Sequence, residues 1–262
     1  MRRFAFVMPF IALILGIGAL FLRYTEINTV FDATTGLPEQ NALVTLILIG
    51  VSVVVILMAV IFGIVVAKKY DANTEYTRAF SPSGLLYLGV FFILGLGLIA
   101  AAVMYYLDQR EVMVLLDMFF AAFAVLTGVS LIFLARSAYK GRGGSELCVF
   151  GVIPVFFMCI WLILTYKQHA SDPVILDYAY ECVAASAAAL SFYFGAGYIF
   201  KKPKPGKTVF SYLLTIFFCT LVLADDMLLP VKIFLGVIII AQFINCIEFI
   251  RNLKKKQPQI EE

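Results

Sequence analysis

Five charged residues lie inside long apolar segments of this chain, where charged side chains are rare, and four of them lie at a similar depth. Three of these four are acids, Asp117, Asp177 and Glu181, and the fourth is a base, Lys232. Within a membrane-spanning segment such side chains are costly, and they usually pair with one another or mark the path of an ion or a solute. We therefore treat these four residues as candidates for binding an ion or a substrate.

The spacing of Asp177 and Glu181 indicates what they could do. Residues four apart share one face of a helix, about one turn from each other. Two carboxylates that close in an apolar setting do not both ionise easily, so at least one is expected to hold a proton. Lys232 is expected to form a salt bridge with Asp117, Asp177 or Glu181. Because three acids face one base, the group favours a proton, a metal cation or an amine.

A structural interpretation of the same residues stays open. Counted from the nearer end of each span at 1.5 Å per residue, all four lie about 6 to 12 Å below one boundary of the membrane, where they could also reach water. Asp177 could be stabilised by a helix N-terminus, and Lys232 could simply lock two helices together. Glu248 lies near the opposite boundary, three positions before Arg251, and either an i,i+3 ion pair or snorkelling of its side chain toward water accounts for it.

The composition shows which kind of structure must position these residues. The chain has 262 residues, of which 63% are hydrophobic and 14% charged, and its mean hydropathy is +0.98. That is too little polar material to cover a water-facing surface, so a soluble globule is excluded and lipid must cover much of the protein. A net charge of +3 is small, and we expect neither disorder nor a nucleic-acid partner.

Eight segments are long and apolar enough to cross a bilayer, which takes about 20 residues as a helix. They are continuous apolar runs without the alternation of membrane strands. The sequence therefore predicts an all-α polytopic membrane protein, a bundle of eight transmembrane helices forming one membrane domain over 1–262. No connection is long enough to form a soluble domain. The predicted spans are 4–22, 43–67, 85–107, 112–135, 147–166, 174–200, 209–224 and 228–250.

The basic residues predict the orientation of this bundle. Loops on one side hold 16 Lys and Arg residues, whereas those on the other hold only Arg23, Arg110 and Lys167. The positive-inside rule then places both termini in the cytoplasm, with the spans arranged as four hairpins in the plasma (cytoplasmic) membrane. The first span could also be a signal peptide, but its apolar run is longer than usual and no clear cleavage site follows.

Other patterns favour structural roles. The segments KKPKPGK and YKGRGGS and the tail RNLKKKQPQIEE are expected to anchor the cytoplasmic side, with contacts to anionic lipid head groups or a protein partner. Gly16, Gly18, Gly95, Gly97 and the alanine run 184–189 are expected to let helices pack closely. All five cysteines lie within spans, without a paired spacing, and there is a single histidine. We therefore expect no disulfide framework, metal site or cofactor.

Two functions fit these features. The first is a small-solute or ion transporter, with proton or cation coupling through carboxylates in an outward-facing cavity. The alternative is a non-catalytic membrane component, such as a receptor, an assembly factor or a partner subunit, in which buried charges lock the helices. We expect no enzyme, because the catalytic motifs GxSxG and HExxH are absent from the sequence. A cavity among the fourth, sixth and eighth spans would favour the transporter, and a dry, fully paired ion cluster would favour the alternative.

Overall fold

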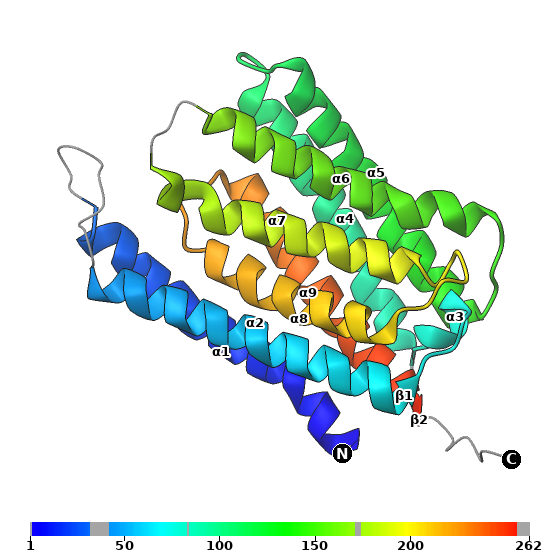
Figure 1. Ribbon diagram of the computed structural model, residues 1–262. Coiled ribbons are helices and arrows are strands. Elements are labelled where there is room, and N and C mark those ends of the chain that lie inside the picture. Colours follow the sequence, from blue (N-terminus) through cyan, green and yellow to red (C-terminus); the bar gives the residue numbers. More distant parts are fainter. Residues whose placement is uncertain (1, 32–41, 83, 171–173, 256–262) are drawn as a thin grey trace, which may run out of the picture.

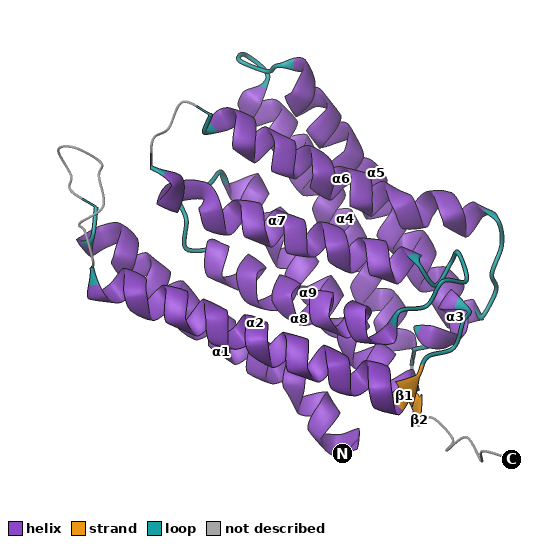
Figure 2. Ribbon diagram, viewed as in Figure 1, coloured by secondary structure: helices purple, strands orange, loops and turns teal. Residues whose placement is uncertain are grey.

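The computed structural model describes residues 2–31, 42–82, 84–170 and 174–255. It is nearly all helical, at 82%, with long helices packed side by side (Figures 1 and 2). The helices are α1 (Arg2–Thr29), α2 (Leu43–Lys69), α3 (Tyr76–Ala79), α4 (Leu85–Gln109), α5 (Leu115–Lys140), α6 (Glu146–Gln168), α7 (Ile175–Ala196), α8 (Pro205–Val222) and α9 (Leu229–Asn252). Two short antiparallel strands, β1 (Tyr70–Asp71) and β2 (Lys254–Lys255), join the end of α2 to the end of α9.

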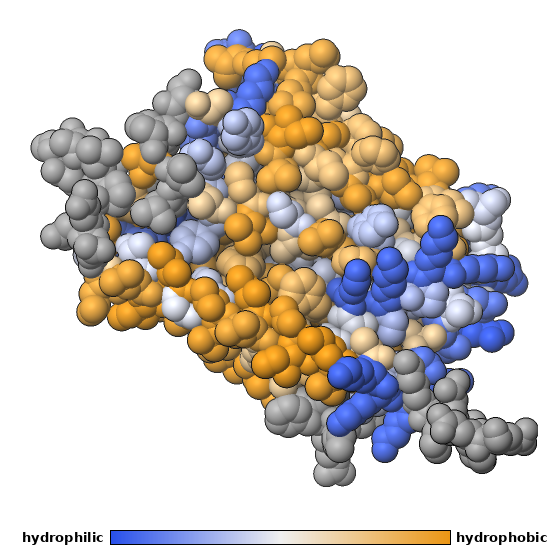
Figure 3. Space-filling model, viewed as in Figure 1, coloured by the Kyte–Doolittle hydropathy of each residue, from blue (hydrophilic) through white to orange (hydrophobic). Residues whose placement is uncertain are grey.

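Seven of the described helices, all except α3 and α7, are long and apolar enough to cross a membrane. The molecule is thus an all-α, multi-pass membrane bundle in a lipid bilayer. Figure 3 shows the apolar surface along the length of the helices. α7 has the length of its neighbours, but alanine, serine and tyrosine take the place of leucine and isoleucine over much of it, and it carries Asp177 and Glu181.

The helices match the predicted spans to within a few residues, except at the end of α1. The segment after Leu22 contains no glycine or proline that would stop a helix, and α1 continues to Thr29. Arg23 therefore lies inside a helix, with only 1% of its surface exposed. The segment from Arg23 to Thr29, predicted as the start of an external loop, is therefore helical.

α8 is the central helix. It packs against α1, α2, α7 and α9, and in Figure 1 it lies between α2 and α7. Of its span, 78% is buried inside the protein, compared with 22% for α2. This position explains its low hydropathy, because a helix surrounded by protein can carry hydroxyl groups that bond back to its own backbone. Such bonds are formed by Thr208, Ser211, Thr215 and Thr220.

The remaining helices complete a ring. Successive contacts run α8 to α7, α6, α5, α4 and α9, and α9 returns to α8. The hairpin of α1 and α2 packs on the outside of this ring, against α8. The cavities described below are lined by helices of this ring together with α1, α3 and connecting segments.

Small residues allow the closest helix contacts, as predicted for some positions. A Cβ atom on Gly95 of α4 would lie 2.6 Å from the carbonyl oxygen of Gly128 on α5, so the two backbones touch. Gly16 lies similarly close to α8, whereas Gly18 faces open space. Close packing is therefore confirmed at Gly16 and Gly95 but not at Gly18.

The two ends of the bundle differ. The Arg23 end is where α1 ends and α2 begins. The basic end is the opposite one, where hydrophilic side chains gather in Figure 3 and where α3 and both strands lie. Here Asn252 donates hydrogen bonds to the carbonyl oxygens of Ala79 (3.1 Å) and Ser81 (2.9 Å), which hold α3 against the end of α9.

Candidate functional site

A cavity of about 460 Å³, called here the large cavity, lies at the Arg23 end. Its wall is built by α1, α4, α5, α6 and α7, by the turn between α8 and α9, and by the start of α9. The exposed side chains of Asp226 and Leu228 lie at its rim. Deeper in the wall are Arg23, Glu181 and Asp225. The cavity thus brings acidic groups together in a solvent-connected space within the helix bundle.

Of the predicted site residues whose side chains the structure describes, Glu181 alone lines this cavity. Its Oε1 accepts hydrogen bonds from Trp161 Nε1 (2.8 Å) and from Thr165 Oγ1 (2.7 Å). Trp161 and Thr165 are four residues apart on α6 and share one face, so a single carboxylate oxygen reaches both. Among the described residues nothing donates to Oε2, which leaves that oxygen available to a proton or a ligand.

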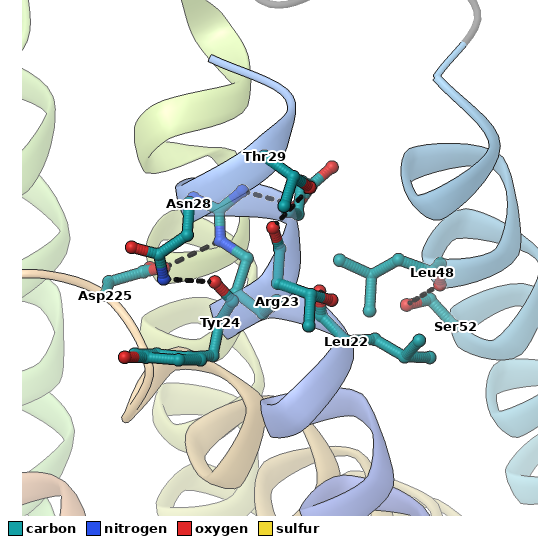
Figure 4. Close-up of polar contacts among 10 residues, drawn as sticks. Leu22, Arg23, Tyr24, Asn28, Thr29, Leu48, Ser52 and Asp225 are labelled. Carbon is teal, nitrogen blue, oxygen red and sulfur yellow. Dashed lines mark hydrogen bonds and ion pairs between the residues drawn. The ribbon is translucent and has the colours of Figure 1, made fainter. Parts of the chain in front are cut away.

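Arg23 is held by two carboxylates. Its Nε donates to Asp225 Oδ1 (2.7 Å) and its Nη1 to Glu26 Oε2 (2.8 Å). Figure 4 shows the Arg23 side chain turned toward Asp225. The guanidinium also lies over the ring of Tyr180, 5.3 Å from its centroid, in a cation–π contact. This triad of Arg23, Glu26 and Asp225 ties α1 to the turn between α8 and α9.

The triad carries one positive and two negative charges. Burial raises the pKa of Asp225 to about 6, against the lowering effect of Arg23, and nearby Glu181 and Glu26 raise it further. Asp225 Oδ2 is buried, and no described residue forms a hydrogen bond to it. Because buried polar atoms normally have a partner, this oxygen at the cavity wall is a natural position for a proton or a bound polar group.

The other predicted site residues are placed differently. Asp117 accepts from the Tyr105 hydroxyl (3.0 Å) and from the backbone N–H of Val114 (3.0 Å) at the start of α5. Such a carboxylate stabilises a helix N-terminus. Asp117 does not line the large cavity, although Tyr105 does. The side chain of Asp177 lies outside the described residues.

Lys232 is half-buried on α9, and it is not part of the lining of the large cavity. The sequence predicts a salt bridge from Lys232 to Asp117, Asp177 or Glu181. Lys232 forms none with Asp117 or Glu181, since none of the described ion pairs includes Lys232, and the side chain of Asp177 lies outside the described residues. The carboxylates of Asp117 and Glu181 each already accept two hydrogen bonds from uncharged donors. By contrast, the predicted ion pair of Glu248 with Arg251 is confirmed.

Sequence reasoning missed Arg23, Glu26 and Asp225. A local signal was present for two of them: Arg23 and Glu26 are three apart in a segment without a helix breaker, so they share a helix face. Asp225 lies 202 positions from its partner, and no local spacing could connect the two.

Four aromatic rings close the floor of the large cavity. Phe120 of α5, Phe157 and Trp161 of α6, and Phe234 of α9 each contact the other three, with ring centroids 5.2 to 6.1 Å apart. All four side chains are buried. Phe120 and Trp161 form part of the cavity lining. We call these four side chains the ring layer.

No protein-family model, no curated protein and no solved structure matches this chain. The function is therefore inferred from the geometry of the site.

Proposed function

We propose that this protein transports a small polar solute across the plasma (cytoplasmic) membrane, coupled to a proton or cation that binds at Glu181 and Asp225. One observation carries the proposal: the large cavity, about 460 Å³ in volume, exposes two carboxylates within the bundle and is closed at its floor by the ring layer. Such concave sites between helices are where membrane carriers bind solutes. In this role the protein is a carrier and not an enzyme, and no cofactor is required.

The proposal includes eight spans with both termini in the cytoplasm. α7 supports the eighth span, because it has 22 residues and packs between α6 and α8. With Arg23 buried, only Arg110 and Lys167 remain as basic residues of the loops predicted to be external. The Arg23 end then faces outward, and the basic end can contact anionic lipid head groups or a protein partner.

The charges around the large cavity favour a proton or another cation. Glu181, Asp225 and Asp226 line it with Arg23, and Glu26 shares the same arginine. The large cavity and its surroundings therefore contain more acidic than basic side chains. A pKa of about 6 for Asp225 makes proton binding sensitive to pH close to neutrality, as coupling requires. Protonation of Asp225 would leave the triad without net charge.

Solute-dependent proton movement tests the proposal. Purified protein is reconstituted in vesicles that enclose a pH-sensitive dye, and a panel of small polar solutes and inorganic cations is added outside. We expect at least one solute to move protons with the wild-type protein and Glu181→Gln to abolish this movement. Glu146→Gln is the matched control, because this exposed carboxylate lies at the start of α6, at the other end of the bundle, and lines neither the large cavity nor the two smaller ones. A folded Glu181→Gln protein with unchanged proton movement would contradict the coupling role.

The triad favours a second candidate function, a non-catalytic membrane component. A buried arginine bonded to two carboxylates fixes α1 to the turn between α8 and α9, as expected for a static lock. In that case a partner protein should co-purify in fixed stoichiometry and be lost with Arg23→Met. No solute in the panel should then move protons or accumulate in the vesicles.

A further inference from the structure

A second cavity lies deeper in the bundle, toward the basic end. Its volume is about 30 Å³, room for about two water molecules or a small polar group, and we call it the small chamber. Its polar lining comes from α3, α4, α7, α8 and α9. These residues are Tyr76, Tyr87, Ser191, Tyr212, Gln242 and Asn245. None of the described lining residues is charged.

Gln242 is the unusual member of this lining. It is 1% exposed, and neither its amide nitrogen nor its amide oxygen has a hydrogen-bond partner in the described part of the chain. Its neighbour Asn245 accepts a hydrogen bond from the Tyr87 hydroxyl (3.1 Å). A buried amide that lacks partners is costly. The small chamber therefore contains a donor and an acceptor available to a ligand.

The order of residues along the helices places the ring layer between the two cavities. On α9, Val231 lines the large cavity, Phe234 belongs to the ring layer and Gln242 lines the small chamber. Val231 and Gln242 are 11 positions apart, about 16 Å along a helix. α6 runs in the opposite direction and gives the same order, with Trp161 at the large cavity and Gly151 at the small chamber.

Thr127 of α5 lies between the large cavity and the small chamber. Its hydroxyl is buried, and no described residue bonds to it. Phe120, Thr127 and Leu131 follow one another at helical spacing, so they share a face of α5. Phe120 lines the large cavity and Leu131 the small chamber. An unpaired polar group therefore lies on the face of α5 that connects the two cavities.

A third cavity, of about 360 Å³, lies at the basic end. It shares Tyr76 and Ile199 with the lining of the small chamber. Its other lining residues include Glu75 and Lys201, both exposed. Two side chains thus separate the small chamber from a cavity that reaches the basic end.

We propose that the three cavities are successive parts of one translocation path and that the small chamber binds an uncharged, hydrogen-bonding group of the solute, such as an amide or a hydroxyl. The inference rests on the proposed function and narrows its substrate class. An ion in the chamber would lack a compensating charge, which is costly in a buried site, whereas Gln242, Asn245 and the tyrosines match a neutral donor and acceptor. The ring layer closes the small chamber on one side, and Tyr76 and Ile199 close it on the other.

The rate at which a small reagent reaches the small chamber tests whether the ring layer closes the proposed path. Ser191→Cys places a thiol in its wall, and modification by methyl methanethiosulfonate, a small uncharged reagent, is followed at that site by mass spectrometry. We expect slow modification with the ring layer intact and at least tenfold faster modification in Phe157→Ala/Phe234→Ala. The matched control is Phe133→Ala/Phe150→Ala, which removes a stacked pair of rings that lines none of the three cavities. Equal rates of thiol modification in the folded ring-layer variant and in this control would overturn the proposal of a continuous path.

Protection from modification tests the ligand class. Acetamide at high concentration should slow modification of the Ser191→Cys thiol in the ring-layer variant at least threefold, and Gln242→Leu should remove this protection. Potassium chloride at the same concentration should give none. Protection by potassium chloride, or protection that survives Gln242→Leu, would overturn the assignment of the chamber to an uncharged group.

A failed path can be distinguished from misfolding and from a failed coupling role. If the double ring-layer variant does not fold, Phe234→Leu provides the same comparison with a milder change. Thiol modification requires no proton coupling, so a failed path leaves solute-dependent proton movement intact. Conversely, the loss of the Glu181 coupling role leaves the modification rates unchanged.

Discussion

Replacing Asp225 by asparagine should change how the stability of the protein depends on pH. In the wild-type protein, Asp225 and Glu26 share the single positive charge of Arg23. Asparagine keeps the shape of the side chain and imitates the protonated acid. The variant therefore leaves one buried cation facing one buried anion, which is the balanced state that the wild-type triad reaches only when it binds a proton.

The magnitude follows from the pKa. Asp225 has an ordinary value of 3.8, raised to about 6 by burial in the folded protein. The folded state thus binds the proton more tightly than the unfolded state, and stability is lost as the pH rises from about 4 to about 6. At 1.36 kcal/mol per pH unit, the loss is about 3 kcal/mol. Asp225→Asn should remove this loss and be more stable than the wild-type protein at pH 7 by up to about 3 kcal/mol.

Equilibrium unfolding in mild detergent, followed by helical circular dichroism between pH 4 and pH 7, measures this effect. Asp226→Asn is the control, because Asp226 is the exposed neighbour of Asp225 and should leave the wild-type profile unchanged. The reasoning is refuted if Asp225→Asn keeps the wild-type slope between pH 4 and pH 6, or if the wild-type protein gains stability over that interval.

Three further variants test the packing and the site. Arg23→Met leaves two buried carboxylates without their cation and should lower the free energy of unfolding at pH 7 by about 3 to 5 kcal/mol; the triple variant Arg23→Met/Glu26→Gln/Asp225→Asn should recover most of this loss in the same unfolding assay. Gly128→Ala places a Cβ 2.6 Å from the Gly95 carbonyl oxygen and should cost about 1 to 3 kcal/mol, whereas Gly97→Ala, whose nearest contact is at 3.9 Å, should leave the melting temperature unchanged. Trp161→Phe removes one of two hydrogen bonds to Glu181 and should cost about 1 to 3 kcal/mol, seen as a lower melting temperature.

The helices were predictable because lipid imposes a simple rule on the chain. A segment of about 20 apolar residues becomes a helix in a bilayer, and most ends fell where the apolar runs end. Arg23 shows the limit of this rule. Hydropathy ends a span at the first charged residue, but a charge buried against Asp225 does not end a helix. The helix boundary was therefore missed together with the ion pair.

The candidate site was only partly predictable. Glu181 was predictable because acids are rare inside a membrane-spanning segment, and its partners Trp161 and Thr165 lie on the preceding helix. Gln242 is uncharged and was not predicted as a site residue, because its role depends on the absence of a hydrogen-bond partner among the described residues of six neighbouring helices. Such a property exists only after the helices have packed, so no spacing in the sequence reports it.

The central position of α8 has a consequence for how the protein is made. As this segment leaves the ribosome, its hydroxyl groups and modest hydropathy give it a weak tendency to partition into lipid by itself. α1, α2 and α7, which enclose most of it in the finished bundle, are synthesised earlier and are already in the membrane. They provide the protein surface that α8 needs, so its insertion is a step of assembly and depends on the chain that precedes it.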